Sequence, residues 1–254
     1  MAYDHRPMYV QCRLNYGLYT GDVAPTSFLG PVNITKLELN SIKQEQERLI
    51  SNMEGSWGEA LASVAKPTDP GTMTMEFNSM PTELLSLVIG ADVTALTQTN
   101  DTVTDEVITT VLDTWVPLAN KFLDSTVTLV LETDGTPDVA IATSKYEVDY
   151  NAGLIRALHS DAVGVGMLVT YKKLAITAGE SYAAGKAKSA YIMLYGTAVE
   201  KVTGNAGLLT VYKASVSPSS AYDWVKGGFA TGALTGDLIT PTGFGSPYLF
   251  QYNP

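Results

Sequence analysis

Apolar and polar side chains alternate along several segments of this 254-residue chain, and this pattern limits its fold more than any other feature. Met73, Met75 and Phe77, for example, are separated by single polar residues. Successive side chains of a β-strand point to opposite faces, so such a run places its apolar set on one side of a sheet. The same reasoning predicts strands at 32–40, 73–77, 126–132, 146–151, 165–172, 191–196 and 208–216. We therefore expect a mainly β protein.

Two of these strands are apolar on both faces, at 191–195 and 208–212. Such strands are usually covered on both sides. We expect the core to cover one face and a helix or a neighbouring subunit to cover the other.

Turn residues separate the strands. Asn151-Ala152-Gly153 predicts a three-residue hairpin loop with Gly153 in the left-handed conformation. Further turns are expected at 134–137 and 203–205. Near the C-terminus, the Gly-rich stretch 227–245 is expected to hold a short last strand, with Phe229, Leu234, Leu238 and Ile239 as its apolar residues.

One α-helix is expected at 79–90. Ser79 is a suitable cap, Pro81 is tolerated in a first turn, and Gly90 can end the helix. Leu84, Leu85 and Val88 would then share one face and pack across a sheet.

The segment 41–70 has no such pattern. It begins with a very polar run at 44–48, continues through a turn region at 52–58, and is too long for an ordinary loop. We expect an extended arm that becomes ordered on contact with a partner, because a solvated loop would not carry large apolar groups. A mobile loop and a short amphipathic helix at 44–53 remain alternatives. The expected contact residues are Leu49, Ile50, Met53, Trp57 and Leu61.

The charge composition argues against a nucleic-acid-binding protein. Charged residues make up 17% of the chain, with 16 basic and 26 acidic side chains and a net charge of −10. Gripping DNA requires Lys and Arg against phosphate. An acidic chain instead suits a surface that DNA passes without binding.

Few residues are available for catalysis. A nucleophile paired with a base would need His5 or His159, and His159 is expected to end a strand. The single cysteine, Cys12, is expected at a buried strand position and suits a reducing cytoplasm. Glu147 and Asp149 share a strand face as a glycosidase pair would, but such a face is more often solvated or lumenal. We expect no catalytic residue, cofactor or metal, and no signal peptide or membrane span.

The order of these features resembles the tail tube proteins, or major tail proteins, of long-tailed siphophages. Residues 28–39 resemble the family's opening strand, which leads into a Glu-rich arm. The strand at 73–77 and the helix follow, 145–155 resembles the central hairpin, and the stretches 190–196 and 211–229 resemble the closing strands. On this likeness we divide the chain into an N-terminal arm at 1–27, a β domain at 28–240 and a C-terminal tail at 241–254.

The resemblance implies a β-sandwich or partly closed β-barrel with one flanking helix and a long arm. It implies hexameric rings, joined strand to strand between subunits and stacked into a tube within the virion, after assembly in the host cytoplasm. The implied partners are other copies of the chain, a tape-measure protein, a tail terminator and tail-tip proteins. DNA would cross the lumen without specific binding. The expected lumen-lining residues are Lys36, Glu38, Thr74, Glu76, Glu147 and Asp149.

Three other classes stay open. The tube protein of a contractile secretion system shares this architecture, although such chains are usually shorter. The 14 tyrosines and 3 tryptophans suggest a carbohydrate-binding β-sandwich, but such modules gather aromatic residues on one face, whereas here they are scattered. An enzyme is the third class, and the chain offers it no credible nucleophile and base.

Overall fold

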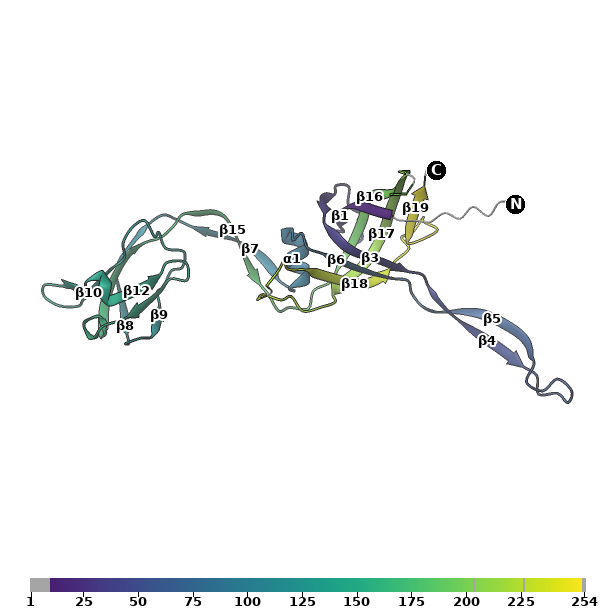
Figure 1. The fold of residues 1–254 in the computed structure, drawn as a ribbon, viewed down its shortest axis with the longest axis horizontal. Helices are drawn as coiled ribbons and strands as arrows, with labels where there is room; N and C mark the ends of the chain where they lie inside the picture. The colour runs from purple at the N-terminus through teal and green to yellow at the C-terminus, as the bar shows by residue number, and fades with distance from the viewer. Residues whose placement is uncertain (1–9, 203, 226, 253–254) are drawn as a thin grey trace. The chain divides into compact units, whose positions relative to one another are not determined.

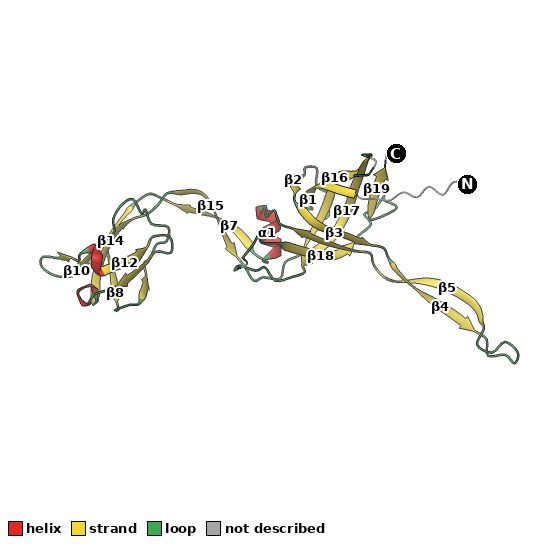
Figure 2. Ribbon diagram, in the orientation of Figure 1, coloured by secondary structure: helices red, strands yellow, loops and turns green. Residues whose placement is uncertain are grey.

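The computed structural model describes residues 10–202, 204–225 and 227–252 and is mainly β, with strands throughout and a single α-helix in this part of the chain (Figures 1 and 2). Its contacts divide the chain into two units. Unit 1 combines the residues up to Val93 with those from Tyr182 onward, and unit 2 is Thr94–Ser181. Unit 2 is thus an insertion within unit 1, whereas the sequence offered no linker to mark a division within 28–240.

Unit 1 is organised around one eight-stranded antiparallel sheet. Its strands are β1 (Val10–Leu18), β2 (Leu29–Val32), β3 (Ile34–Asn40), β6 (Thr72–Phe77), β16 (Ala190–Glu200), β17 (Ala206–Pro218), β18 (Gly232–Leu238) and β19 (Tyr248–Tyr252). The strand order is β2-β1-β16-β17-β18-β6-β3, and β19 pairs with the first half of β17.

The two ends of this sheet lie close together. The end strands β2 and β3 are separated in sequence by Asn33 alone, so the sheet must curl back on itself. Asn33 is held at the end of β6, because its carbonyl accepts from the backbone N–H of Asn78 at 3.2 Å and its side chain donates to the Asn78 side chain at 2.6 Å. No ladder joins β2 to β3 among the described strands, so the sheet is curled without being a closed barrel.

The inner face of the curled sheet carries the core of unit 1. Met73, Met75 and Phe77 are fully buried, as their alternation predicted, while Thr74 and Glu76 face outward. The helix α1 (Thr82–Val88) packs against β17 and β18 on this inner side.

The helix is shorter than predicted. It begins after Pro81 with no side-chain cap, so Ser79 has no capping role. It buries Leu84, Leu87 and Val88, whereas Leu85 is only half-buried. The predicted end is confirmed: Gly90 has a φ of +59°, and a Cβ there would lie 2.1 Å from the carbonyl oxygen of Lys186.

Unit 2 consists of two sheets around a second core. The first sheet has the order β11-β10-β14-β8 and the second β12-β13-β9. Its strands are β8 (Thr102–Thr110), β9 (Trp115–Pro117), β10 (Val130–Thr133), β11 (Val139–Ala140), β12 (Tyr146–Asp149), β13 (Leu154–Ala157) and β14 (Gly164–Lys172), with 3-10 turns at Thr143–Lys145 and Ser160–Ala162. Leu131, Val169 and Ile155 are fully buried between the sheets. The predicted hairpin between β12 and β13 is confirmed, and Gly153 has a φ of +64°.

Two further antiparallel ladders complete the fold. One pairs β7 (Asp92–Gln98) with β15 (Ile176–Ala183), the two segments through which the chain passes from unit 1 to unit 2 and back. The other pairs β4 (Lys43–Ile50) with β5 (Ala60–Asp69) and occupies the segment expected as an arm.

The structure differs from the sequence analysis at both ends of the chain. The expected N-terminal arm at 1–27 contains β1, whose Leu14 and Tyr16 are buried in the core, because β1 pairs along its whole length with β16. The expected C-terminal tail at 241–254 contains β19.

Three local predictions are corrected. Cys12 is exposed, because the first half of β1 extends past the core and lines a groove between β1 and β3. The strand expected at 126–132 begins only at Val130, since Asp124 holds Thr126 in a turn. On β16, Tyr191 and Tyr195 are 38% and 40% exposed, so within this chain the strand is covered on one face only.

We predict that Gly236→Ala destabilises unit 1. A Cβ at this position would lie 1.5 Å from the carbonyl oxygen of Ser215 in β17, so the two strands must move apart. We expect this overpacking to lower the free energy of unfolding by about 1–3 kcal/mol. Urea unfolding of the variant measures this difference. Gly245→Ala is the matched control, because a Cβ there meets nothing within 4 Å. Equal stability of the two variants would contradict this packing.

Candidate assembly surfaces

The β4–β5 hairpin is the first candidate surface. Its ladder runs from the pair Lys43 and Asp69 to the pair Ile50 and Ala60, and every residue of both strands is exposed. It continues directly from the β3–β6 ladder, whose last pair is Asn40 and Thr72 (Figure 1). The predicted arm is therefore a β-hairpin, and the alternative helix at 44–53 is wrong, because residues 44–50 pair with β5 and 51–53 lie at the tip.

The tip of the hairpin is stabilised by short-range hydrogen bonds. The Ser51 and Ser56 hydroxyls are 2.7 Å apart, and the backbone of Ser51 bonds to those of Gly58 and Glu59 at 2.9 and 2.8 Å. Gly55 and Gly58 have φ values of +89° and +84°, which glycine adopts without strain. The tip thus has a defined turn that holds Trp57 in solvent, 77% exposed.

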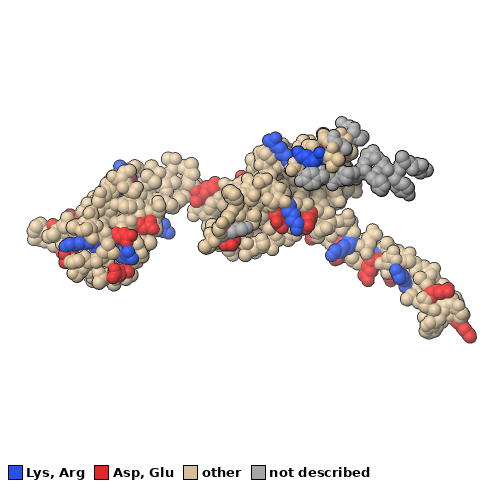
Figure 3. Space-filling view, in the orientation of Figure 1, with Lys and Arg blue, Asp and Glu red and all other residues tan. Residues whose placement is uncertain are grey.

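Large apolar side chains follow both strands of the hairpin without forming a core. All five predicted contact residues lie here and are exposed, together with residues that the sequence analysis did not select; the full set is Ile42, Leu49, Ile50, Met53, Trp57, Leu61 and Val64. An isolated two-stranded hairpin is marginally stable in water. Contiguous exposed apolar groups usually mark a contact with another molecule. Charged residues of both signs lie between them (Figure 3).

The outer face of the unit 1 sheet is the second candidate surface. The register aligns Lys36 with Glu76 across β3 and β6, and Glu38 with Thr74. Thr74 in turn lies beside Thr235 of β18, with the hydroxyl oxygens 3.2 Å apart. Four of the six predicted lumen residues therefore share one polar face, opposite the core.

Over β3, β6 and β18 this face has more acidic than basic side chains. The Lys36 Nζ lies 3.1 Å from Glu38 Oε1 and 3.9 Å from Glu76 Oε1, and the hydrogen bond that Lys36 donates to Glu38 raises the pKa of Lys36. Asp237, exposed on β18, is a third carboxylate. Lys36 thus lies beside two carboxylates, whereas Asp237 aligns with Thr72 at the other end of the ladder. Small polar residues of β17, Ser215 and Ser217, lie on the same side of the sheet.

The remaining two predicted lumen residues lie in unit 2 and have local contacts. Glu147 accepts a hydrogen bond from Arg156 at 2.5 Å, and Arg156 stacks over Trp115 at 5.1 Å. Asp149 accepts from the backbone N–H groups of Asn151 and Ala152, both at 3.0 Å. The structure therefore gives Glu147 an ion pair and Asp149 a role in closing the β12–β13 hairpin.

The candidate catalytic residues are held in ordinary structural contacts. His159 lies two residues beyond β13, and its Nδ1 accepts from the backbone N–H of Asp161 at 3.2 Å, which caps a 3-10 turn. The Asp161 carboxylate is hydrogen-bonded to Lys145, which lowers the pKa of Asp161. His5 lies outside the described residues. Within the described ranges, no group of three or more His, Cys, Asp or Glu side chains could hold a metal.

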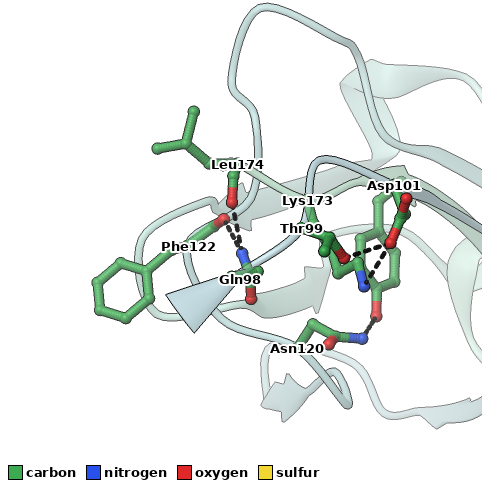
Figure 4. A network of polar contacts seen from close by, with 8 residues as sticks. Gln98, Thr99, Asp101, Asn120, Phe122, Lys173 and Leu174 are labelled. Atoms are coloured by element: carbon green, nitrogen blue, oxygen red, sulfur yellow. Dashed lines mark hydrogen bonds and ion pairs between the residues drawn. The ribbon is translucent and has the colours of Figure 1, made fainter. Parts of the chain in front are cut away.

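A polar network in unit 2 joins its loops (Figure 4). The Gln98 amide donates to the carbonyls of Phe122 and Leu174, at 3.0 and 2.9 Å. Asn120 donates to the Tyr171 hydroxyl at 2.8 Å, and that hydroxyl donates to Glu106 at 2.5 Å. Burial, with the Glu106 hydrogen bond, raises the pKa of Tyr171 to about 12. Because these groups bond mainly to one another, the network stabilises the loops.

A third surface was missed by the sequence analysis. The loop between β17 and β18, residues 219–231, exposes Trp224, Val225 and Phe229 at 71%, 92% and 88%. Phe229 was expected in the last strand, but β18 begins only at Gly232. One sequence signal could have located this loop: its large apolar residues stand among glycines and do not alternate with polar residues as those of a strand would.

The sequence match covers all three surfaces. The family described as "Protein of unknown function UCP028589" matches residues 8–243. The chain belongs to this family. Unit 2, the β4–β5 hairpin and the 219–231 loop fall within the matched span, as does unit 1 except for β19. No curated protein matches the chain. No helix in the described part of the chain is long and apolar enough to cross a membrane.

We predict that Trp57→Ser leaves the fold unchanged. Because Trp57 is mostly exposed, its loss should alter the free energy of unfolding by less than about 0.5 kcal/mol. Leu194→Ala, at a fully buried site on β16, should cost about 2–5 kcal/mol in the same urea titration. A large loss of stability in Trp57→Ser would mean that the hairpin tip is part of the fold and not a free contact surface.

Proposed function

We propose that this chain is the structural subunit of a bacteriophage tail tube of the siphophage type, assembling with copies of itself into stacked rings. The observation that carries the proposal is the β4–β5 hairpin, which has exposed apolar residues on a ladder without a core. Such a hairpin becomes stable when a second molecule covers it. The neighbouring ring would supply that cover.

The sheet of unit 1 supports the same proposal. One face of the sheet is buried under α1 and the core, while the other is polar and exposed over β3, β6 and β18. The end strands β2 and β3 each pair on one side only among the described strands. Unpaired strand edges promote association with other chains, and a ring of subunits would pair them. The open polar face would then surround the lumen.

The charges on that face suit the passage of DNA. Over β3, β6 and β18 the carboxylates Glu38, Glu76 and Asp237 outnumber the one cation, Lys36. Phosphates are repelled by such a surface, so DNA would pass through the lumen without binding. In this proposal the chain catalyses no reaction and needs no cofactor.

Removal of the hairpin should abolish polymerisation without unfolding the subunit. Asn40 and Thr72 are directly paired, so an Asn-Gly turn replacing residues 41–71 can join β3 to β6. We expect this variant to sediment as a monomer under conditions in which the parent chain forms tubes. Val165→Ser, which alters an equally exposed residue of unit 2, is the control and should polymerise. Full-length tubes from the hairpin deletion would contradict the proposal.

Reversal of the lumenal charge should slow the release of DNA. Glu38→Lys with Glu76→Lys leaves three cations and one carboxylate on β3, β6 and β18, and phosphates would then bind to the face. We expect intact tails but slower genome ejection, measured by dye fluorescence of released DNA, with the delay decreasing as salt rises. Asp134→Lys, an exposed substitution in unit 2, is the control. Ejection at the parent rate by the double variant would show that this face does not line the lumen.

A further inference from the structure

The loop at 219–231 and the β4–β5 hairpin lie at opposite ends of one strand pair. At one end of the β3–β6 ladder, Asn40 and Thr72 continue into the hairpin. At the other end, Phe77 pairs with Ile34 and with Gly232, the residue directly after the loop. Both features belong to unit 1, and the length of β3 places the root of the hairpin about 20 Å from the loop.

The apolar side chains of this loop are only partly covered by the rest of the described residues. Tyr222 is half-buried against the unit 1 core and its ring packs edge-on against Trp224, with centroids 4.8 Å apart. This contact anchors one side of the loop. Beyond it, Trp224, Val225 and Phe229 are largely in water, although a short loop gains no stability from exposing such groups.

We propose that the 219–231 loop of one copy receives the hairpin of the next copy, with Trp57 and its neighbours packing on Trp224 and Phe229. This inference rests on the proposed tube assembly and identifies the contact that joins successive rings. A donor at one end of a strand pair and an acceptor at the other make a head-to-tail interface, which propagates into a filament. Paired aromatic and aliphatic anchors are also the groups that dominate the energy of protein interfaces.

A second copy is the occupant that this geometry favours. Contact within one chain would require the hairpin to fold back along the whole β3–β6 ladder at its root. A head-to-tail neighbour needs no such change, because the hairpin already continues from the ladder end that the loop does not occupy.

Cysteine cross-linking tests this contact. In a Cys12→Ser background, which removes the single native thiol, Glu59→Cys and Gly228→Cys are placed in the same chain, so that the apolar anchors Trp57, Trp224 and Phe229 stay in place. Both sites are exposed, and a Cβ at Gly228 meets nothing within 4 Å, so folding should be unaffected. We expect oxidised tubes to give a ladder of covalent dimers, trimers and higher multiples on denaturing gels. A short bis-maleimide is used in parallel, because a disulfide requires Cβ atoms within about 4.5 Å.

Mixing and control variants separate the possible outcomes. Subunits carrying only Glu59→Cys, mixed with subunits carrying only Gly228→Cys, should form mixed dimers and nothing larger. Glu59→Cys with Val165→Cys, an exposed site in unit 2, should stay uncrosslinked. Tubes that assemble but do not cross-link between positions 59 and 228, or that cross-link equally to position 165, overturn this inference and leave the proposed function intact. A parent chain that forms no tubes overturns both.

Discussion

Apolar side chains on a two-stranded hairpin have no interior in which to be buried. The β4–β5 hairpin carries Leu49, Ile50 and Trp57 on exposed positions, and its own ladder cannot cover them. The hydrophobic effect therefore favours contact between this hairpin and a second molecule, and burial of one large apolar side chain contributes about 1.5–3 kcal/mol. Because the hairpin continues from the β3–β6 ladder, any force on it passes directly into the main sheet of unit 1.

The main sheet has the other features that the proposed tube assembly requires. Its inner face is occupied by the core and by α1, which frees the outer face to carry Lys36, Glu38 and Glu76. Unit 2 is inserted between β7 and β15 and has its own core, so its fold does not depend on the residues that form the proposed lumen. In the proposed assembly, the unit 1 sheet would form the ring, the β4–β5 hairpin would join successive rings, and unit 2 would be a separate pair of packed sheets.

Local patterns predicted the local structure well. The alternation around Met75 placed β6 and its buried face, and the glycines at 90 and 153 ended a helix and closed a hairpin as expected.

The pairing of strands that are distant in the sequence could not be predicted from these local patterns. The polar run at 44–48 contains good helix formers, yet it is a strand because β5 pairs with it. In the same way β1 belongs to the sheet through β16, and Cys12 is exposed because the core does not extend beneath it. The insertion of unit 2 left no linker, since paired strands make the connection. The structure places the five expected contact residues on one hairpin, and Lys36, Glu38, Thr74 and Glu76 on one face of one sheet. Glu147 and Asp149, chosen because they lie on the polar face of an alternating strand, belong to the other unit. The contact and lumen roles of all these residues stay predictions.

Electron microscopy of the purified, concentrated full-length chain tests the central claim most directly. Self-assembly through the hairpin and the open sheet predicts hollow tubes or stacked rings, with a central channel and a regular axial repeat. The same sample is also examined after mixing with a purified phage tail-tip complex, which supplies a starting ring. A chain that stays monomeric in both preparations would contradict the account, and its exposed apolar hairpin would then require a different partner.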